Sequence, residues 1–109
     1  MKQLFDISFE DDALEFIGRL EPKAAEKVFK ILERAQHEHD PKFFSKLTKT
    51  IWEFRIKFFG KEFRLLAFWH TEVKSLVICT HGFEKKTQKT PANEIKKAEQ
   101  KRKNILGEN

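Results

Sequence analysis

The sequence lacks the features of a secreted or membrane-bound protein. Its 109 residues include one cysteine, Cys79, which excludes an internal disulfide and suits a reducing cytoplasm. The N-terminus reaches acidic residues without an apolar signal region, and no apolar run approaches the ~20 residues that span a bilayer. We therefore expect a soluble cytoplasmic protein with no membrane partner. Cys79 lies in an apolar run, so we interpret it as an inert core thiol.

Tyrosine is absent as well, and the chain has only four glycines and three prolines. Its apolar bulk comes from twelve Phe and two Trp, in a chain long enough to bury one hydrophobic core. We expect a single domain over residues 1–109, with a disordered tail at residues 107–109.

Metal-ligand spacing is also missing. Zinc sites need His and Cys at short, fixed separations, which Cys79 and the four histidines do not have. Glu53 and Glu84 stand alone among cations, so Mg²⁺ has no cage of carboxylates. We expect neither a metal nor a cofactor.

Positive charge, in contrast, is abundant and unevenly placed. Residues 1–50 carry 9 Lys/Arg against 10 Asp/Glu, a net charge of −1, whereas residues 51–109 carry 13 against 7, a net charge of +6. The C-terminal half therefore suits an acidic partner, such as nucleic acid, an anionic membrane or an acidic protein segment. A basic surface that only keeps the protein soluble is the simpler interpretation.

Hydrophobic periodicity in the N-terminal half predicts a strand and two helices. Residues 3–9 alternate polar and apolar, which indicates a strand with one buried face. A short helix then ends at Glu21, because the residue before Pro22 is disfavoured in the α region. Pro22 begins a second amphipathic helix, which closes at residues 37–40. Residues 42–49 are expected to form a connecting loop.

The C-terminal half predicts three strands and a last helix. Residues 51–59 alternate cleanly, while residues 62–69 and 75–81 are apolar on both faces, as expected of central strands. Thr90-Pro91 provides a cap and a first-turn proline for a helix to about residue 106. The order β-α-α-β-β-β-α predicts an α+β fold, with an antiparallel sheet flanked by helices.

The first two of these strands can be paired in register. Gly60-Lys61 matches a type II′ turn, which places Lys57 opposite Arg64, with Arg55 on the same face. Directly opposed like charges destabilise a sheet, so a sequence that keeps them is suited to holding an anion there. A solvated edge with splayed side chains is the alternative.

A basic segment follows the last strand, with the sequence HGFEKKTQKTP at residues 81–91. Its three lysines and its Gln can attract phosphate and donate hydrogen bonds to phosphate oxygens; these residues are Lys85, Lys86, Gln88 and Lys89. The terminal helix adds further candidate RNA contacts, namely Lys96, Lys97, Lys101 and Arg102. A cationic helix face binds phosphates without reading sequence, although a merely solvated face is as good an interpretation.

The element order, the strand sequence WEFRIK at residues 52–57, Phe63-Arg64 and the 81–91 string together resemble the RelE/ParE toxin superfamily. The similarity is greatest to its HigB-like, phage-derived Gp49-like branch, and it covers nearly the whole chain. It implies a toxin of a type II toxin–antitoxin system, neutralised by a cognate antitoxin with a helix-turn-helix domain. RelE-type and HigB-type toxins cut mRNA on the ribosome, whereas ParE-type toxins poison DNA gyrase.

The resemblance places the catalytic cations on the central strands and just after them. Metal-free cleavage needs the 2′-OH to attack phosphorus, and we expect Arg64 to stabilise the charge that develops there. Arg55 and Lys57 would hold flanking phosphates, with Lys57 as a possible base. Lys85 or Lys86 would stabilise the departing oxygen. RelE uses a tyrosine near its C-terminus, and this chain has no tyrosine.

His81 has two interpretations. It could act as an acid or base in RNA cleavage, but a lone histidine that ends an apolar strand is more often structural. For the whole chain, the expected function is a ribosome-dependent mRNA endonuclease that inhibits translation and growth. A non-enzymatic gyrase inhibitor and a plain nucleic-acid-binding module are the two alternatives.

Overall fold

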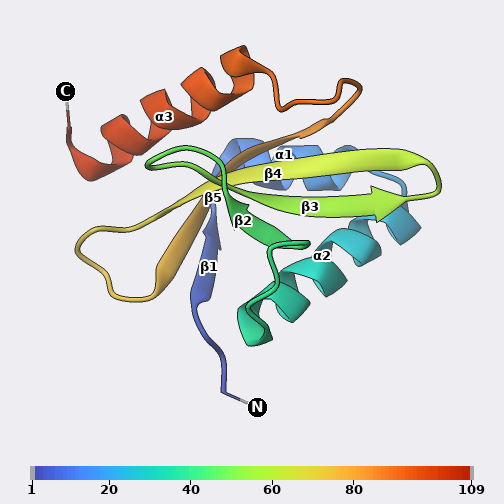
Figure 1. The fold of residues 1–109 in the computed structure, drawn as a ribbon, viewed down its shortest axis with the longest axis horizontal. Coiled ribbons are helices and arrows are strands. Elements are labelled where there is room, and N and C mark those ends of the chain that lie inside the picture. The colour runs from blue at the N-terminus through green and yellow to red at the C-terminus, as the bar shows by residue number, and fades with distance from the viewer. Residues whose placement is uncertain (1, 109) are drawn as a thin grey trace.

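The computed structural model describes residues 2–108 and confirms the α+β class. A mixed five-stranded sheet has the strand order β1-β5-β4-β3-β2 (Figure 1). In chain order the elements are β1 (Asp6–Phe9), α1 (Asp11–Arg19), α2 (Pro22–His37), β2 (Phe44–Lys46), β3 (Trp52–Phe58), β4 (Lys61–Trp69), β5 (Leu76–Glu84) and α3 (Ala92–Leu106). None of the helices within residues 2–108 is long and apolar enough to cross a bilayer.

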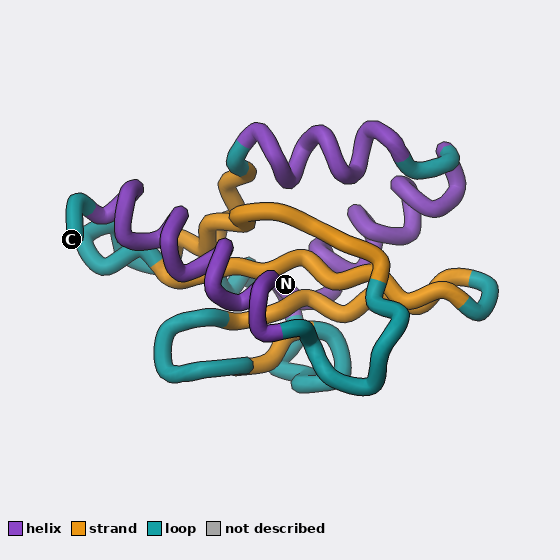
Figure 2. The backbone as a smooth tube through the Cα atoms, turned by 90° about the horizontal axis from the view of Figure 1, so that it is seen from above, coloured by secondary structure: helices purple, strands orange, loops and turns teal. Residues whose placement is uncertain are grey.

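The sheet separates two hydrophobic clusters, and Figure 2 shows helices on both sides of the sheet. One face packs on α1 and α2, where Val28 and Ile31 contact a cluster that includes Phe54 and Leu65. On the other face α3 crosses the sheet and buries Ala98 with its neighbours. Because α3 carries only a thin apolar stripe, it covers part of this face, and the β3–β4 hairpin extends beyond it (Figure 1).

Two features of the sheet differ from the sequence prediction. β1 pairs with β5 in parallel, so the sheet is not antiparallel throughout. The predicted loop at residues 42–49 contains a short edge strand, β2, which pairs with β3. Phe44 of β2 stacks on Phe54 with ring centroids 4.2 Å apart, and this aromatic contact accounts for a strand of only three residues.

The β3–β4 turn lies one residue earlier than predicted. Phe58 pairs with Lys61, which leaves Phe59 and Gly60 as the two turn residues. Both have positive φ, 45° and 79°, as a type I′ turn requires. Each strand keeps its predicted faces, but the cross-strand partners change.

The observed register shows that the predicted pairing of Lys57 with Arg64 is wrong. Arg64 lies opposite Arg55, and Lys57 lies opposite Glu62. Two like charges still face each other across the hairpin, but both are now arginines.

β5 continues past its predicted end at residue 81 to Glu84. This extension depends on Gly82, which lies under α1. A Cβ at this position would be 2.7 Å from Leu65 Cδ2 and closer still to the ring of Phe16, so only glycine lets α1 pack this near the strand. The glycine of the 81–91 string is thus explained by packing.

α3 ends at Leu106 as predicted, but its N-terminal cap differs from the prediction. Pro91 occupies the N-cap position, and the Thr90 hydroxyl donates its hydrogen bond to Glu53 instead of capping the helix. At the C-terminal end, Gly107 has a φ of 73° and closes the helix in a left-handed conformation. Glu108 forms an ion pair with Arg102. Of the predicted tail, Asn109 lies outside the described residues.

Candidate nucleic-acid interface

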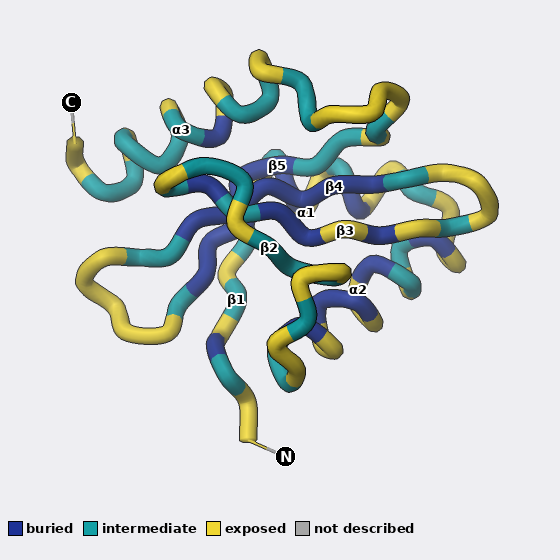
Figure 3. Tube along the Cα trace, viewed as in Figure 1, coloured by how far each residue is buried: buried dark blue, intermediate teal, exposed yellow. Residues whose placement is uncertain are grey.

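An open groove lies where the β3–β4 hairpin extends beyond α3. It has a volume of about 710 Å³, and it is lined by β3, the turn, the start of β4, the end of β5 and residues 85–88. Five cations and one amide line it, namely Arg55, Lys57, Lys61, Lys85, Lys86 and Gln88. The groove also contains two carboxylates, those of Glu62 and Glu84. The exposed hairpin and the exposed segment after β5 are visible side by side in Figure 3.

Two hydrogen bonds hold residues 85–90 over the hairpin. The Lys85 N–H donates to the Glu62 carbonyl at 2.7 Å, which continues the β4–β5 pairing by one residue. At the other end, the Thr90 hydroxyl donates to Glu53 Oε1 at 2.8 Å. A segment fixed at both ends presents its lysines in a restricted region above β3 and β4. The sequence-predicted residues Arg55, Lys57, Lys85, Lys86 and Gln88 are thereby brought together.

Arg64 lies underneath this surface instead of on it. Its side chain is only 1% exposed, so it cannot contact the scissile phosphate as the sequence predicts. Nη2 donates to Glu62 Oε1 at 2.9 Å, and Nε lies 3.4 Å from Glu53 Oε1. The two carboxylates neutralise the charge of Arg64, which lies opposite Arg55. A buried cation needs such partners, because an unpaired charge in the protein interior is strongly destabilising.

Glu53 and Glu62 are the functional partners that sequence reasoning missed. Both lie on the same face as Arg64, Glu62 at two residues' distance along β4 and Glu53 on the neighbouring strand. The alternation of side chains along the strands is enough to predict that these three residues share a face. What the sequence does not reveal is that Arg64, on the central strand, is covered, whereas Arg55 is exposed.

The groove keeps a positive balance, and one of its two carboxylates, that of Glu62, is paired with a cation. The hydrogen bond from Arg64 lowers the pKa of Glu62, and the charges of Arg64, Lys85 and Lys57 lower it further against the effect of burial. Glu62 is therefore ionised at neutral pH. With five cations against two carboxylates at its walls, the groove attracts an anion.

His81 lies apart from the groove, beneath α3. It is 2% exposed; Nε2 lies 3.0 Å from Glu94 Oε1 and Nδ1 lies 3.0 Å from the Thr80 hydroxyl. Burial lowers the pKa of His81, the Glu94 hydrogen bond opposes this, and the charge of Lys97 adds to the lowering. A neutral histidine enclosed in this way cannot reach a substrate, so its catalytic interpretation is corrected to a structural one.

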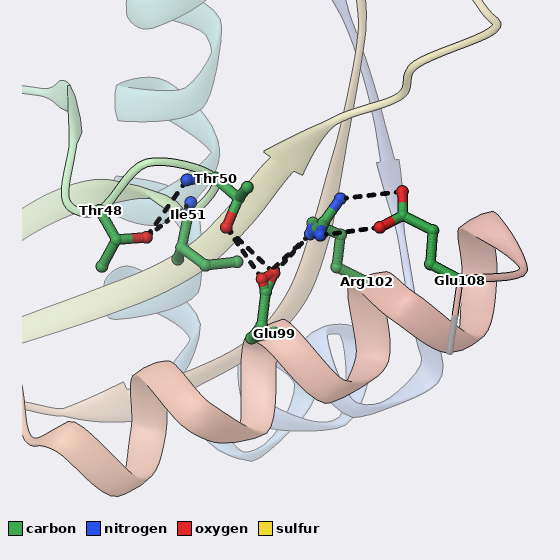
Figure 4. Close-up of polar contacts among 6 residues, drawn as sticks. All are labelled: Thr48, Thr50, Ile51, Glu99, Arg102 and Glu108. Atoms are coloured by element: carbon green, nitrogen blue, oxygen red, sulfur yellow. Dashed lines mark hydrogen bonds and ion pairs between the residues drawn. The ribbon is translucent and has the colours of Figure 1, made fainter.

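The cations of α3 divide into two groups. Lys101 forms an ion pair with Asp12 of α1 at 2.8 Å, and Arg102 bonds to Glu99 and Glu108 (Figure 4). These contacts dock α3 and its C-terminal end, which reduces what the two side chains can offer to RNA. Lys96 and Lys97 are exposed, as is Lys89. They remain predicted RNA contacts, but they are not among the residues that line the groove.

The remaining candidate groups are inert or dispersed. Burial raises the pKa of the Cys79 thiol, which keeps it protonated in the core. Within residues 2–108, no group of three or more His, Cys, Asp or Glu side chains is gathered closely enough to hold a metal ion.

Comparison with known proteins gives a family match. The model of the family described as "Phage derived protein Gp49-like (DUF891)" matches residues 15–103, a range that includes every residue of the groove. No curated protein matches the chain.

Proposed function

Because the chain belongs to the Gp49-like family of phage-derived proteins, we propose that it is a toxin of a type II toxin–antitoxin system. In this proposal it cuts mRNA on the ribosome, inhibits translation and growth, and is neutralised in the cytoplasm by a helix-turn-helix antitoxin. The observation that carries the proposal is the convergence of cations from β3, the start of β4 and residues 85–86 on one groove.

The groove suits the chemistry of metal-free RNA cleavage. In that reaction the 2′-OH loses its proton as its oxygen bonds to phosphorus, and the 5′ oxygen takes up a proton as its bond to phosphorus breaks, leaving a 2′,3′-cyclic phosphate and a 5′-hydroxyl. Negative charge grows on the phosphorane and on the leaving oxygen. Arg55 is exposed, and its planar guanidinium group can donate two hydrogen bonds to a phosphate, so it takes the charge-stabilising role that the sequence analysis assigned to Arg64. Lys57 orients the adjacent phosphate, and Lys85 and Lys86 stabilise the departing oxygen.

Arg64 has a supporting role in this proposal. Arg64 of β4 forms ion pairs with Glu62 of the same strand and with Glu53 of β3, the strand that carries Arg55. Glu53 also accepts the hydrogen bond from Thr90. Arg64 is therefore a positioning residue. Lys96 and Lys97 add sequence-independent contacts to ribosomal RNA phosphates.

The test is induced expression of an R55A/K57A variant against a matched control. Both side chains are exposed, so the variant should fold, as circular dichroism would verify. We expect growth inhibition to fall by about 100-fold or more, because electrostatic groups at a reacting phosphate typically contribute that much. New mRNA 5′ ends, mapped after brief induction of the wild type, should disappear. The control is K23A/K30A, which removes the same charge from exposed positions on α2.

Other results would favour other functions. Broken DNA with intact mRNA after induction would indicate a gyrase inhibitor. Undiminished growth inhibition by the folded R55A/K57A variant would contradict a catalytic groove. A small, additive loss for each cation would fit a plain nucleic-acid-binding module.

A further inference from the structure

Phe59 is the most exposed large apolar side chain in the described part of the chain. It is 90% exposed, whereas Leu14, Phe29 and Val73 are 48–49% exposed. It occupies the tip of the β3–β4 hairpin, directly before Gly60 and Lys61, which line the cationic groove. Its ring meets only the edge of Phe58 among the aromatic side chains, with centroids 4.7 Å apart.

The backbone at Phe59 is unfavourable for this residue. Its φ of 45° lies in the left-handed region, where a type I′ turn favours Asn, Asp or Gly. The sequence therefore accepts two penalties at one position, a strained conformation and an aromatic ring in water. Neither is offset by burial in the folded chain. A contact with another molecule that buries the ring would offset these penalties.

The surroundings of Phe59 indicate the chemistry of that other molecule. Lys57 and Lys61 flank the turn, and both line the groove together with Lys85 and Lys86. An anionic chain whose phosphates lie in this groove carries its bases past the hairpin tip. Aromatic rings next to cationic grooves bind single-stranded nucleic acid by stacking on unpaired bases. An acidic protein segment would be drawn by the same charge, but it would give the ring no planar partner.

We propose that Phe59 stacks on an unpaired base of the RNA whose backbone occupies the groove, and that the groove therefore takes single-stranded RNA. The inference rests on the proposed function and deepens it, because it names the conformation of the substrate. Stacking requires a base outside a duplex, so double-stranded RNA cannot use this contact.

The experiment measures binding of the purified chain to a fluorescent 2′-O-methyl RNA oligonucleotide, which has no free 2′-OH and cannot be cut. The single strand and its duplex are titrated at several salt concentrations. F59N should raise the melting temperature by about 4 °C, because Asn-Gly suits the turn. It should nevertheless weaken single-strand binding at least about fivefold, the low end for one stacked base. F59W should bind like the wild type, and F59L should not.

Salt and strand dependence separate this contact from the groove itself. F59N should leave the salt dependence unchanged and abolish most of the preference for single strands, because stacking releases no counterions. The groove variant R55A should reduce the salt dependence. Wild-type affinity for F59N, or full affinity for F59L, would overturn the stacking role while leaving the groove intact. A loss of growth inhibition by F59N with unchanged RNA affinity would overturn it in favour of a protein partner.

If the wild type does not bind the single strand, or if R55A binds it as well as the wild type does, the groove is not an RNA-binding site and the stacking role fails with it. The proposed function is tested separately, by the mRNA 5′ ends that the wild type and R55A/K57A produce after induction, so the two failures are distinguishable.

Discussion

At the scale of single residues, burial determines what the polar side chains do. Arg64, Glu53 and His81 have the chemical types of catalytic groups, but each is at most 6% exposed. Arg64 hydrogen-bonds to Glu62 and forms an ion pair with Glu53 of the neighbouring strand, and His81 joins Thr80 of β5 to Glu94 of α3. These buried groups hold the elements together, whereas Arg55 and Lys57 are exposed and accessible to a ligand.

The enclosure of His81 predicts a pH dependence of stability. Burial and the charges of Lys97 and Lys101 lower its pKa below the usual 6.5, while Glu94 opposes the shift. Below pH 6.5 the unfolded chain therefore binds a proton that the folded chain does not. This contribution to stability is complete above pH 6.5 and is lost as the pH falls through 6.5 towards the folded pKa. Urea unfolding between pH 7.5 and 5 should show the decline.

The matched variant is H81Q, which cannot titrate. Its stability should be lower than that of the wild type at pH 7.5, because the histidine contacts are disturbed, but it should vary less with pH. Equal slopes for the two proteins between pH 7 and 5 would show that His81 is not the group responsible.

At the scale of elements, the segment at residues 85–90 is the part whose position matters most. It has no regular secondary structure, yet it contributes two of the five groove cations. Its position depends on the Lys85 backbone bond and on the Thr90 bond to Glu53, because these two contacts join its ends to β4 and β3.

We predict that T90V will loosen this segment. Loss of the hydroxyl should destabilise the fold by about 1 kcal/mol, a typical value for one hydrogen bond. Affinity for single-stranded RNA should fall severalfold, because lysines that are less well positioned lose more freedom on binding. T90S keeps the hydroxyl and should restore both properties. A T90V protein that loses stability but keeps full RNA affinity would separate the Thr90 bond from the groove.

The elements also show how far the sequence can be interpreted. Strong periodicity predicts α2, β3 and β4 within a residue or two of their observed ends. The turn is missed because Gly60 suits the second position of a type I′ turn as well as the first of a type II′ turn. β2 and the parallel pairing of β1 depend on distant contacts, such as that of Phe44 with Phe54, which local pattern does not contain.

At the scale of the whole molecule, the two halves of the sequence contribute different faces. The N-terminal half, with a net charge of −1, provides the two helices that cover one side of the sheet. The C-terminal half, with a net charge of +6, provides the opposite side, where α3 leaves the hairpin uncovered. The sequence predicts which cations share a face. It does not predict which of them are covered, because that depends on where residues 85–90 cross the hairpin.

The most direct test of the central claim is the salt dependence of affinity for uncleavable single-stranded RNA. If Lys57 contacts a phosphate in the groove, K57A should reduce the slope of log affinity against log salt by about 0.7, the value for one contact on a single strand. K23A, which removes an exposed cation from α2, should leave the slope unchanged. Identical slopes for K57A and the wild type would contradict the assignment of the groove as the phosphate-binding site.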